Sequence, residues 1–393
     1  MIEQVYNKSL LIAWVMLYAF AISLVMARKP YHDSENTYLR SKKILATAFA
    51  LFGIQIMLQW MFDFRGHAPH IATALNITIF HIAAIHFGAA MIILLDHSYR
   101  NARQLRFDCI CFIANMALLW PSTLLATGIH RMILQGISAA IFLLVAIRLV
   151  LIFFRAYHAA VRKVNNYYSN DVDQFVRWLY KSCLGIIVFG LSEAIICFMP
   201  KWVIAIQMTA GDFMFIYIYI SFLNYTLNFG LVETAISEEA PAIGNNDADR
   251  HANSSEQPSS NLTDEMEQRL KKWIADKKYC KNGVTIDDVA NQIYTNRTYI
   301  SSHINERCGC TFRDWINQLR IEEAKQLMTE HDDMTIQEVA LAIGFSSGSH
   351  FAQLFSDKEG VTPSKWRRQT PPTAPTAAYS KTDNEVTIQD AKP

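Results

Sequence analysis

The amino-acid sequence predicts an all-α protein with two dissimilar parts. Residues 1–232 are expected to form a polytopic membrane bundle of about seven helices, because seven apolar runs there are long enough to cross a bilayer. Residues 263–370 are expected to form a smaller helical domain, because apolar residues recur there with helical spacing between charged and turn residues. One pattern occurs twice in this second part, which predicts two helix-turn-helix motifs.

The composition supports the division. Of the 393 residues, 51% are hydrophobic and only 18% are charged, whereas a soluble domain has about 25% charged residues. The first part holds 18 Lys and Arg against 10 Asp and Glu, and residues 263–370 hold 15 against 16. The net charge of +1 is therefore an average over unlike parts and indicates no partner. The seven Cys show no spacing typical of a disulfide framework, which favours a reducing compartment for the polar part.

The basic residues between the apolar runs predict the orientation of the bundle. The predicted spans are residues 9–26, 44–62, 71–95, 107–127, 132–154, 182–199 and 202–227. With the N-terminus outside, the inner segments hold thirteen Lys and Arg and the outer segments hold four. This bias follows the positive-inside rule. An odd number of crossings then puts the C-terminal domain in the cytoplasm.

Four ionisable residues inside the spans form a candidate site, because such groups are costly in hydrocarbon unless they face water or a bundle interior. The predicted ligand pocket, which opens to the outside, consists of His81, His86, Glu193 and Asp212. The alternative is that these side chains form hydrogen bonds between helices and bind nothing. Arg148, near an inner end, is expected to extend its charge toward the interface.

Two segments have the composition of flexible chain. Residues 233–262 are acidic and rich in Ser, Asn, Ala and Pro, and they are predicted to be a linker. Residues 371–393 are predicted to be a disordered tail for the same reason.

The repeat in residues 263–370 predicts two helix pairs. The segment 285–290 aligns with 335–340, and after one inserted residue Ile300 and Ile304 align with Phe351 and Phe355. In the second copy, Thr335 and Ser346 are predicted helix caps and Gly344 supplies the turn. Asn296 is the corresponding cap in the first copy. The second helix of each pair presents small polar side chains that suit base edges in a major groove: Thr298, Ser301 and Ser302 in the first copy, and Ser349, His350 and Gln353 in the second.

The second copy resembles the DNA-binding domain of the AraC/XylS transcription regulators. The resemblance rests on Gly344-Phe345, Phe351, Phe355, Gly360, Thr362-Pro363 and Arg367, and on the connecting-helix stretch INQLRIEEAKQLM with Arg320. It covers about residues 264–369. It implies a two-lobed module whose paired helices enter successive major-groove segments, about 34 Å apart. The expected partners are double-stranded promoter DNA, membrane lipid, a second copy of the chain, and an unknown small-molecule or membrane signal.

The sequence departs from the family's pattern at two points. Tyr294 stands where the family's first unit often has Gly, which predicts a distorted turn or a bridge backbone conformation. The domain is not basic overall, although DNA-binding domains usually have a basic surface. We therefore expect weak binding by one module, strengthened by dimerisation. The basic residues expected to meet phosphates are Arg297, Arg307, Lys358, Lys365, Arg367 and Arg368.

Nothing in the sequence indicates catalysis. No phosphate-binding loop, dinucleotide-binding, nucleophile-elbow or zinc-protease motif occurs, and no cofactor, metal or catalytic residue is expected. The prediction is therefore a membrane-bound regulator whose bundle senses a signal. Two alternatives stay open at this point. The bundle could be a transporter or membrane enzyme that reports its occupancy to the DNA-binding module, or it could only anchor and dimerise the module.

Overall fold

The computed structural model describes residues 2–31, 33, 36–100, 102–196, 199–237 and 260–369. All of the elements described there are helices, and the chain divides into two compact units, residues 1–249 and 250–393. The predicted tail and most of the predicted linker lie outside the described residues. Each unit is described by itself.

The first unit is a bundle of long helices joined by short connections. Its elements are α1 (Ile2–Met26), α2 (Thr37–Phe62), α3 (Phe64–His67), α4 (Pro69–Ile93), the 3₁₀ helix η1 (His97–Arg100), α5 (Ala102–Leu125), α6 (Gly128–Tyr167), the 3₁₀ helix η2 (Val172–Phe175), α7 (Arg177–Ile196), α8 (Lys201–Tyr225) and α9 (Phe229–Ser237).

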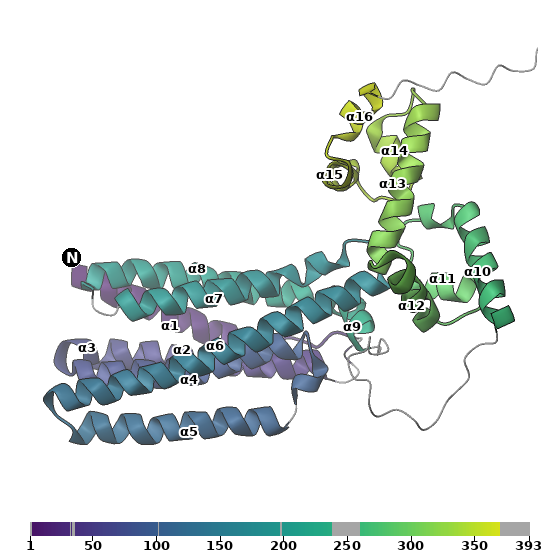
Figure 1. Cartoon of the computed structure of the whole chain (residues 1–393). Coiled ribbons are helices and arrows are strands. Elements are labelled where there is room, and N and C mark those ends of the chain that lie inside the picture. The colour runs from purple at the N-terminus through teal and green to yellow at the C-terminus, as the bar shows by residue number, and fades with distance from the viewer. Residues whose placement is uncertain are drawn as a thin grey trace, which may run out of the picture. The chain divides into compact units, whose positions relative to one another are not determined.

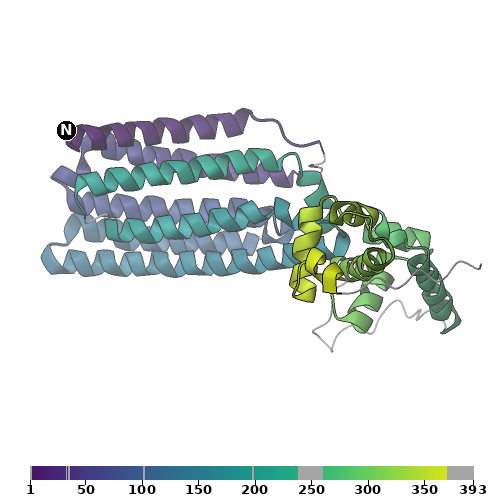
Figure 2. The same cartoon turned by 90° about the horizontal axis from the view of Figure 1, so that it is seen from above.

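The long helices α1, α2, α4, α5, α6, α7 and α8 lie side by side and run alternately in opposite directions (Figures 1 and 2). The α1–α2, α4–α5 and α6–α7 connections therefore lie at the same end of the bundle as α9 (Figure 1). These connections and the helix ends beside them carry the thirteen Lys and Arg residues that the sequence analysis assigns to the inner segments. The structure thus places all thirteen at one end of the bundle.

Six described helices are long and apolar enough to cross a membrane. They are α1, α2, α4, residues 106–125 of α5, α6 and α8. The helix α7, which coincides with the predicted sixth span, is not among them, and it carries Arg177, Lys181 and Glu193. The count of seven spans therefore stays a prediction, although α7 packs against α8 in the bundle.

Aromatic side chains fill the centre of the bundle. Phe49, Phe52, Phe87, Phe189 and Phe215, which come from α2, α4, α7 and α8, contact one another with ring centroids 5.5–6.5 Å apart. In the bilayer that the sequence predicts for this bundle, lipid tails would be as apolar as these rings, so close van der Waals packing rather than the hydrophobic effect would stabilise such an interface.

The helix α9 packs against the end of the bundle that holds the basic connections. Phe229 and Val232 are fully buried. Glu233 Oε2 lies 3.1 Å from His97 Nε2 of η1, and Lys163 of α6 donates a hydrogen bond to the Ile236 carbonyl at 3.0 Å. Residues 233–237, which the composition assigns to the linker, are thus part of a docked helix.

The second unit contains eight helical elements among its described residues. They are α10 (Ser260–Ala275), the 3₁₀ helix η3 (Lys278–Cys280), α11 (Ile286–Gln292), α12 (Arg297–Cys308), α13 (Phe312–Glu330), α14 (Ile336–Ala342), α15 (Gly348–Glu359) and α16 (Pro363–Gln369).

The long helix α13 connects two lobes (Figure 1). One lobe holds α10, α11 and α12, and the other holds α14, α15 and α16. The second lobe has a core of fully buried apolar side chains that includes Ile321, Val339, Ile343, Phe351 and Phe355.

Candidate nucleic-acid interface

The first helix of each pair begins with the same cap. The Asp288 N–H donates to Thr285 Oγ1 at 3.1 Å, and the Thr285 N–H donates to Asp288 Oδ2 at 2.9 Å. Thr335 and Glu338 repeat this arrangement at 3.2 and 2.7 Å. Donation from Thr335 to the Glu338 carboxylate lowers the pKa of that group. Each such capping box satisfies two backbone donors that a helix start leaves unpaired, which confirms the predicted cap at Thr335.

The two turns also have the same hydrogen bonds. The Thr295 N–H donates to the Ala290 carbonyl at 2.9 Å, and the Phe345 N–H donates to the Ala340 carbonyl at 2.9 Å. The bond thus closes the same six-residue segment in both copies. The two helix pairs therefore share their cap and their turn, as the sequence repeat predicts.

Tyr294 and Gly344 occupy the same position in the two turns. Both have left-handed backbones, with φ of 59° at Tyr294 and 90° at Gly344. The prediction of a distorted turn or a bridge conformation at Tyr294 is therefore wrong. The exposed Tyr294 ring lies 5.4 Å from the Arg269 guanidinium of α10, a cation–π contact that helps to offset the cost of the left-handed conformation.

The second helix of each pair begins at a capping side chain. Asn296 Oδ1 accepts from the Tyr299 N–H at 2.9 Å, which confirms the predicted cap of α12. In α15 the cap is Ser347, whose Oγ accepts from the His350 N–H at 3.2 Å. The predicted cap at Ser346 is wrong by one residue, because the turn after Gly344 extends through Ser346 before the helix begins.

The side chains predicted to meet bases lie on the side of α12 and α15 opposite the core. Ile300 and Ile304 of α12 and Phe351 and Phe355 of α15 are fully buried. Of the predicted base-contact residues, Thr298, Ser302, Ser349 and Gln353 are exposed, and Ser301 and His350 are half-buried.

Three of these polar side chains already have neighbours. Ser301 Oγ accepts from Asn305 Nδ2 at 3.5 Å, and Ser349 Oγ lies 3.3 Å from Ser347 Oγ. The His350 ring packs edge-on against Phe345, with centroids 5.6 Å apart. These three residues lie in the first two turns of their helices, the region that reaches base edges in docked recognition helices.

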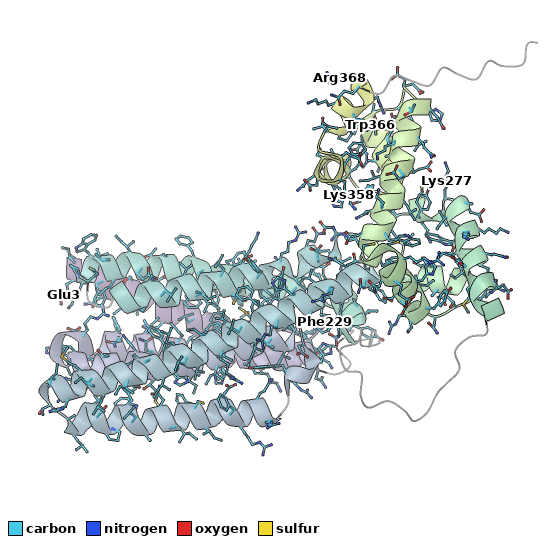
Figure 3. All side chains as sticks on the ribbon, in the orientation of Figure 1. Glu3, Phe229, Lys277, Lys358, Trp366 and Arg368 are labelled. Atoms are coloured by element: carbon cyan, nitrogen blue, oxygen red, sulfur yellow. The ribbon has the colours of Figure 1, made fainter. Side chains whose placement is uncertain are left out.

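The basic residues predicted to meet phosphates differ in their exposure and in the contacts that they already make within the protein. Arg307 forms an ion pair with Glu267 of α10 at 2.6 Å, and Lys358 donates to Gln318 Oε1 of α13 at 3.3 Å. Arg367 is half-buried and donates from Nη1 to the Met334 carbonyl at 2.6 Å, which connects α16 to the segment before α14. Lys365 and Arg368 are exposed, and Arg297 is half-buried. Figure 3 labels two of the six residues, Lys358 and Arg368.

Arg320 holds the two lobes in register. The residue, on α13, is 1% exposed, and its guanidinium donates to the Tyr279 carbonyl at 2.9 Å and to the Lys281 carbonyl at 2.8 Å. It also lies 5.5 Å from the centre of the Phe345 ring in the second turn. Burial lowers the pKa of Arg320 to about 10, so the group stays charged at neutral pH.

The segment around η3 takes part in this junction, and sequence reasoning missed it. Asn282 Nδ2 donates to the Gly344 carbonyl at 3.1 Å, which connects the segment directly to the second turn. Glu323 Oε1 and Oε2 of α13 accept from Lys277 Nζ at 2.5 Å and the Tyr279 hydroxyl at 3.1 Å. The sequence offers no signal for this contact, because Lys277 and Glu323 are 46 residues apart and no pattern relates them.

In the first unit, the four predicted pocket residues have separate surroundings. His81 is fully buried, and its Nδ1 lies 3.1 Å from Asn115 Nδ2 of α5. Ser138 of α6 completes this group, because its Oγ donates to Asn115 Oδ1 at 2.7 Å. His86 Nδ1 instead bonds to the Ile82 carbonyl one turn away at 2.8 Å.

Glu193 and Asp212 do not join these histidines. Glu193 on α7 is buried, Asp212 on α8 is half-buried, and no described hydrogen bond or ion pair connects any two of the four predicted residues. Arg148 forms an ion pair with the buried Asp108 of α5, which the sequence analysis did not single out. The predicted extension of Arg148 toward the interface stays a prediction.

Comparisons with known proteins match part of the second unit. A family model described as a helix-turn-helix domain matches residues 289–369. The chain is 31% identical over 91 residues to the regulatory protein PocR of Salmonella typhimurium, which is 23% of this chain and 30% of PocR. It is 30% identical over 96 residues to the probable transcription factor PqrA of Proteus vulgaris, which is 24% of this chain and 78% of PqrA. This chain therefore covers less than a third of PocR but most of PqrA.

The chain also matches solved structures over part of its length. An AraC-type transcriptional regulator from Chromobacterium violaceum is 22% identical, with a TM-score of 0.25, and the match covers 29% of this chain and 97% of that one. The DNA-binding domain of AdpA in complex with a target DNA is 19% identical, with a TM-score of 0.24, over 26% of this chain and 90% of that one.

Gly344→Ala tests the turn geometry. A Cβ at Gly344 would lie 2.4 Å from the Cys280 carbonyl oxygen, and φ is 90°, so we expect a loss of about 2–4 kcal/mol in the stability of the second lobe. Gly360→Ala is the control, because its φ is 73° but nothing lies within 4 Å of the added Cβ, and we expect about 1 kcal/mol. Hydrogen exchange of the α14 and α15 amides in the full chain measures both. Equal losses would contradict the close approach.

Arg320→Met tests the junction between the lobes. Losing the guanidinium leaves the Tyr279 and Lys281 carbonyls without donors, so we expect a loss of about 3 kcal/mol in the stability of the C-terminal unit. Lys325→Met on the same helix removes only partly exposed ion pairs to Glu322 and Glu359 and should cost at most about 1 kcal/mol. Hydrogen exchange of η3 and α14 separates the two variants. Matching exchange rates would show that Arg320 does not join the lobes.

Proposed function

Because the chain belongs to the family of transcription regulators that carry an AraC-type helix-turn-helix domain, we propose that it is a membrane-held regulator that reads promoter DNA with both helix pairs. One observation carries this proposal: the cap and the turn of α11–α12 recur in α14–α15, in a chain whose other unit is a long apolar bundle. A second helix with a buried apolar side and an outward polar side suits entry into a major groove.

In this proposal α12 and α15 enter successive segments of the major groove on one side of the DNA. Their starts would be about 34 Å apart, one helical turn of DNA. Thr298, Ser301 and Ser302 would contact bases from α12, and Ser349, His350 and Gln353 from α15. Gln353 is the strongest single candidate for specificity, because it is exposed and a glutamine amide can bond to adenine with two hydrogen bonds.

The phosphate contacts would come from the basic residues beside the two helices. Lys365 and Arg368 are exposed and can meet phosphates directly. Arg297, Arg307 and Lys358 have contacts within the protein that would have to be shared or exchanged. Arg367 supports the proposed interface mainly by holding α16 in place through the Met334 carbonyl. A module with so few free positive charges should bind weakly by itself, so we propose that two copies bind together as a homodimer.

The bundle would hold the module at the inner membrane of a bacterium. The end of the bundle that carries α9 and most of the basic residues would face the cytoplasm, where the DNA lies, and the N-terminus would be outside. Since α9 packs against η1 and α6, a shift in the bundle would move the point from which the chain continues to the DNA-binding unit. A signal can drive such a shift only if it binds the two arrangements with different affinity.

Gln353→Ala and Arg368→Gln separate base reading from phosphate contact. An operator is first selected from random DNA with the full chain in lipid nanodiscs. Gln353→Ala should cost about 1–3 kcal/mol on that operator and much less on non-specific DNA. Arg368→Gln should weaken binding to both DNAs alike and reduce the slope of log affinity against log salt by about 1. Wild-type affinity that does not change with salt would contradict phosphate-led binding.

Proteolysis of sealed vesicles tests the orientation. Trypsin added to inside-out inner-membrane vesicles should release the DNA-binding domain by cleaving in the predicted linker, residues 233–262, which contains Arg250. Right-side-out vesicles should protect it, because an odd number of crossings separates it from the N-terminus. Release from right-side-out vesicles alone would reverse the proposed topology.

A further inference from the structure

A groove lies between α1 and α8 at the end of the bundle that also carries α9 (Figure 1). It has a volume of about 590 Å³. One face of the last turns of α1 lines it together with α8, and the lining residues are Ala19, Ile22, Ser23, Met26, Ala27 and Leu223. From Ala19 to Ala27 the helix rises about 12 Å. The groove therefore follows α1 to the point where the α1–α2 connection begins.

Contacts between α1 and α8 hold the two sides of the groove together and leave its lining apolar. The rings of Phe20 and Tyr219 stack, with centroids 4.2 Å apart. The Ser23 hydroxyl in the lining bonds to the Tyr219 hydroxyl at 2.5 Å, so it is satisfied within the protein. The small side chains of Ala19 and Ala27 leave room beside α1. The groove thus suits an apolar chain.

Two exposed positive charges directly follow the lining residue Ala27. Arg28 forms no ion pair or hydrogen bond with any residue that the structure describes. Lys29 Nζ donates to two neutral oxygens, the Asp33 carbonyl at 3.1 Å and Asn36 Oδ1 at 2.9 Å. Neither charge is therefore neutralised by a carboxylate from the described part of the chain.

Lys42 of α2 brings a third positive charge to the same place. The residue is 4% exposed, and its ammonium group donates to the Ala27 carbonyl. The nearby carboxylate of Asp33 is already engaged, because it accepts from two backbone N–H groups at the start of α2 at 3.1 and 3.0 Å. Residues 27–43 hold five Lys and Arg against two Asp and Glu. The apolar groove thus ends at a region of net positive charge.

We propose that this groove binds one anionic phospholipid of the inner leaflet, with an acyl chain along α1 and α8 and the phosphate beside Arg28 and Lys29. The length of the groove fits, because one leaflet contributes half of a hydrocarbon core of about 30 Å. The Arg28 guanidinium would give paired N–H groups to the phosphate, and Lys29 would add a point charge. Basic pockets between helices on the cytoplasmic side recognise lipid headgroups by this chemistry.

The headgroup, rather than the acyl chain, decides which lipid binds. In a bilayer an acyl chain leaves surroundings as apolar as the groove, so it gains little by entering. An anionic headgroup gains the attraction of Arg28 and Lys29, whereas a zwitterionic headgroup also brings a cation that these residues repel. Inorganic phosphate would leave the groove empty and should not displace the lipid.

This inference deepens the proposed function, because it names a class of lipid that the bundle recognises, and it rests on that function for the membrane and its inner leaflet. Binding itself is measured in detergent and needs neither DNA nor a particular orientation. A chain that binds DNA but shows no preference among lipids would keep the proposed function and contradict this site. A chain that prefers the anionic lipid but does not bind DNA would do the reverse.

Native mass spectrometry of the purified full chain in a neutral detergent tests the headgroup. Dioleoyl phosphatidylglycerol and dioleoyl phosphatidylcholine share their acyl chains, and the first should bind about tenfold or more tightly than the second. The double variant Arg28→Gln with Lys29→Gln should remove this preference. The matched control is Arg162→Gln with Lys181→Gln, which removes two exposed positive charges from the same end of the bundle, on α6 and α7, and should keep the preference.

Ala19→Phe tests the groove. The added ring would occupy the lining, so both lipids should bind several-fold more weakly while the preference between them stays. Val25→Phe is the control, because Val25 is exposed on α1 but does not line the groove.

The comparison of the two lipids on the wild-type protein does not depend on whether any variant folds. The proposal is overturned if phosphatidylglycerol binds no more tightly than phosphatidylcholine or if inorganic phosphate displaces it. It is also overturned if the Arg28 and Lys29 double variant keeps the preference, if the control pair on α6 and α7 removes it equally, or if Val25→Phe weakens binding as much as Ala19→Phe.

Discussion

The buried guanidinium of Arg320 is the interaction on which the geometry of the DNA-binding unit depends. It lies on the helix that both lobes share, and it bonds to the backbone of the segment that precedes the first lobe's helix pair. The same segment reaches the second turn through Asn282. A charged group so deeply buried is costly to desolvate, and its two hydrogen bonds and its contact with Phe345 offset that cost only in one arrangement. The distance between α12 and α15, which decides whether both can enter DNA, follows from this arrangement.

Different interactions, namely van der Waals packing and polar contacts between helices, organise the bundle. In lipid, apolar side chains gain little by leaving their surroundings, so packing and polar contacts select which helices associate. The aromatic centre around Phe49 and Phe215 fits α2, α4, α7 and α8 together. Polar pairs connect α5 to its neighbours, among them Asp108 with Arg148 and Asn115 with Ser138. The polar residues of the bundle are therefore of two kinds: pairs such as these satisfy one another, whereas Glu193 Oε2 has no hydrogen-bond partner among the described residues.

The sequence predicts the repeated half of this structure well, because local signals carry it. The caps at Thr335 and Asn296 and the turn at Gly344 depend on residues within a few positions of one another. The cap at Ser347 was misplaced by one residue because two adjacent serines offer the same chemistry. The left-handed Tyr294 was missed because only the whole turn, held by the Thr295 bond, can impose that conformation on a side chain other than glycine.

Contacts between distant segments were harder to predict. Glu323 and Lys277 are far apart in the chain and have no pattern that relates them. His81 was predicted to face a pocket on its polarity alone, whereas the structure pairs it with Asn115. Polarity inside a bundle thus identifies residues that need partners, and only the packing identifies the partners.

The central claim is that one module presents two reading helices at a spacing fixed by α13 and Arg320. Hydroxyl-radical footprinting of the full chain in nanodiscs, on an operator that it has selected, tests this most directly. The account predicts, for each module, two protected segments centred about 10 base pairs apart on the same side of the DNA. A single protected segment for each module, or two segments on opposite sides of the DNA, would contradict it.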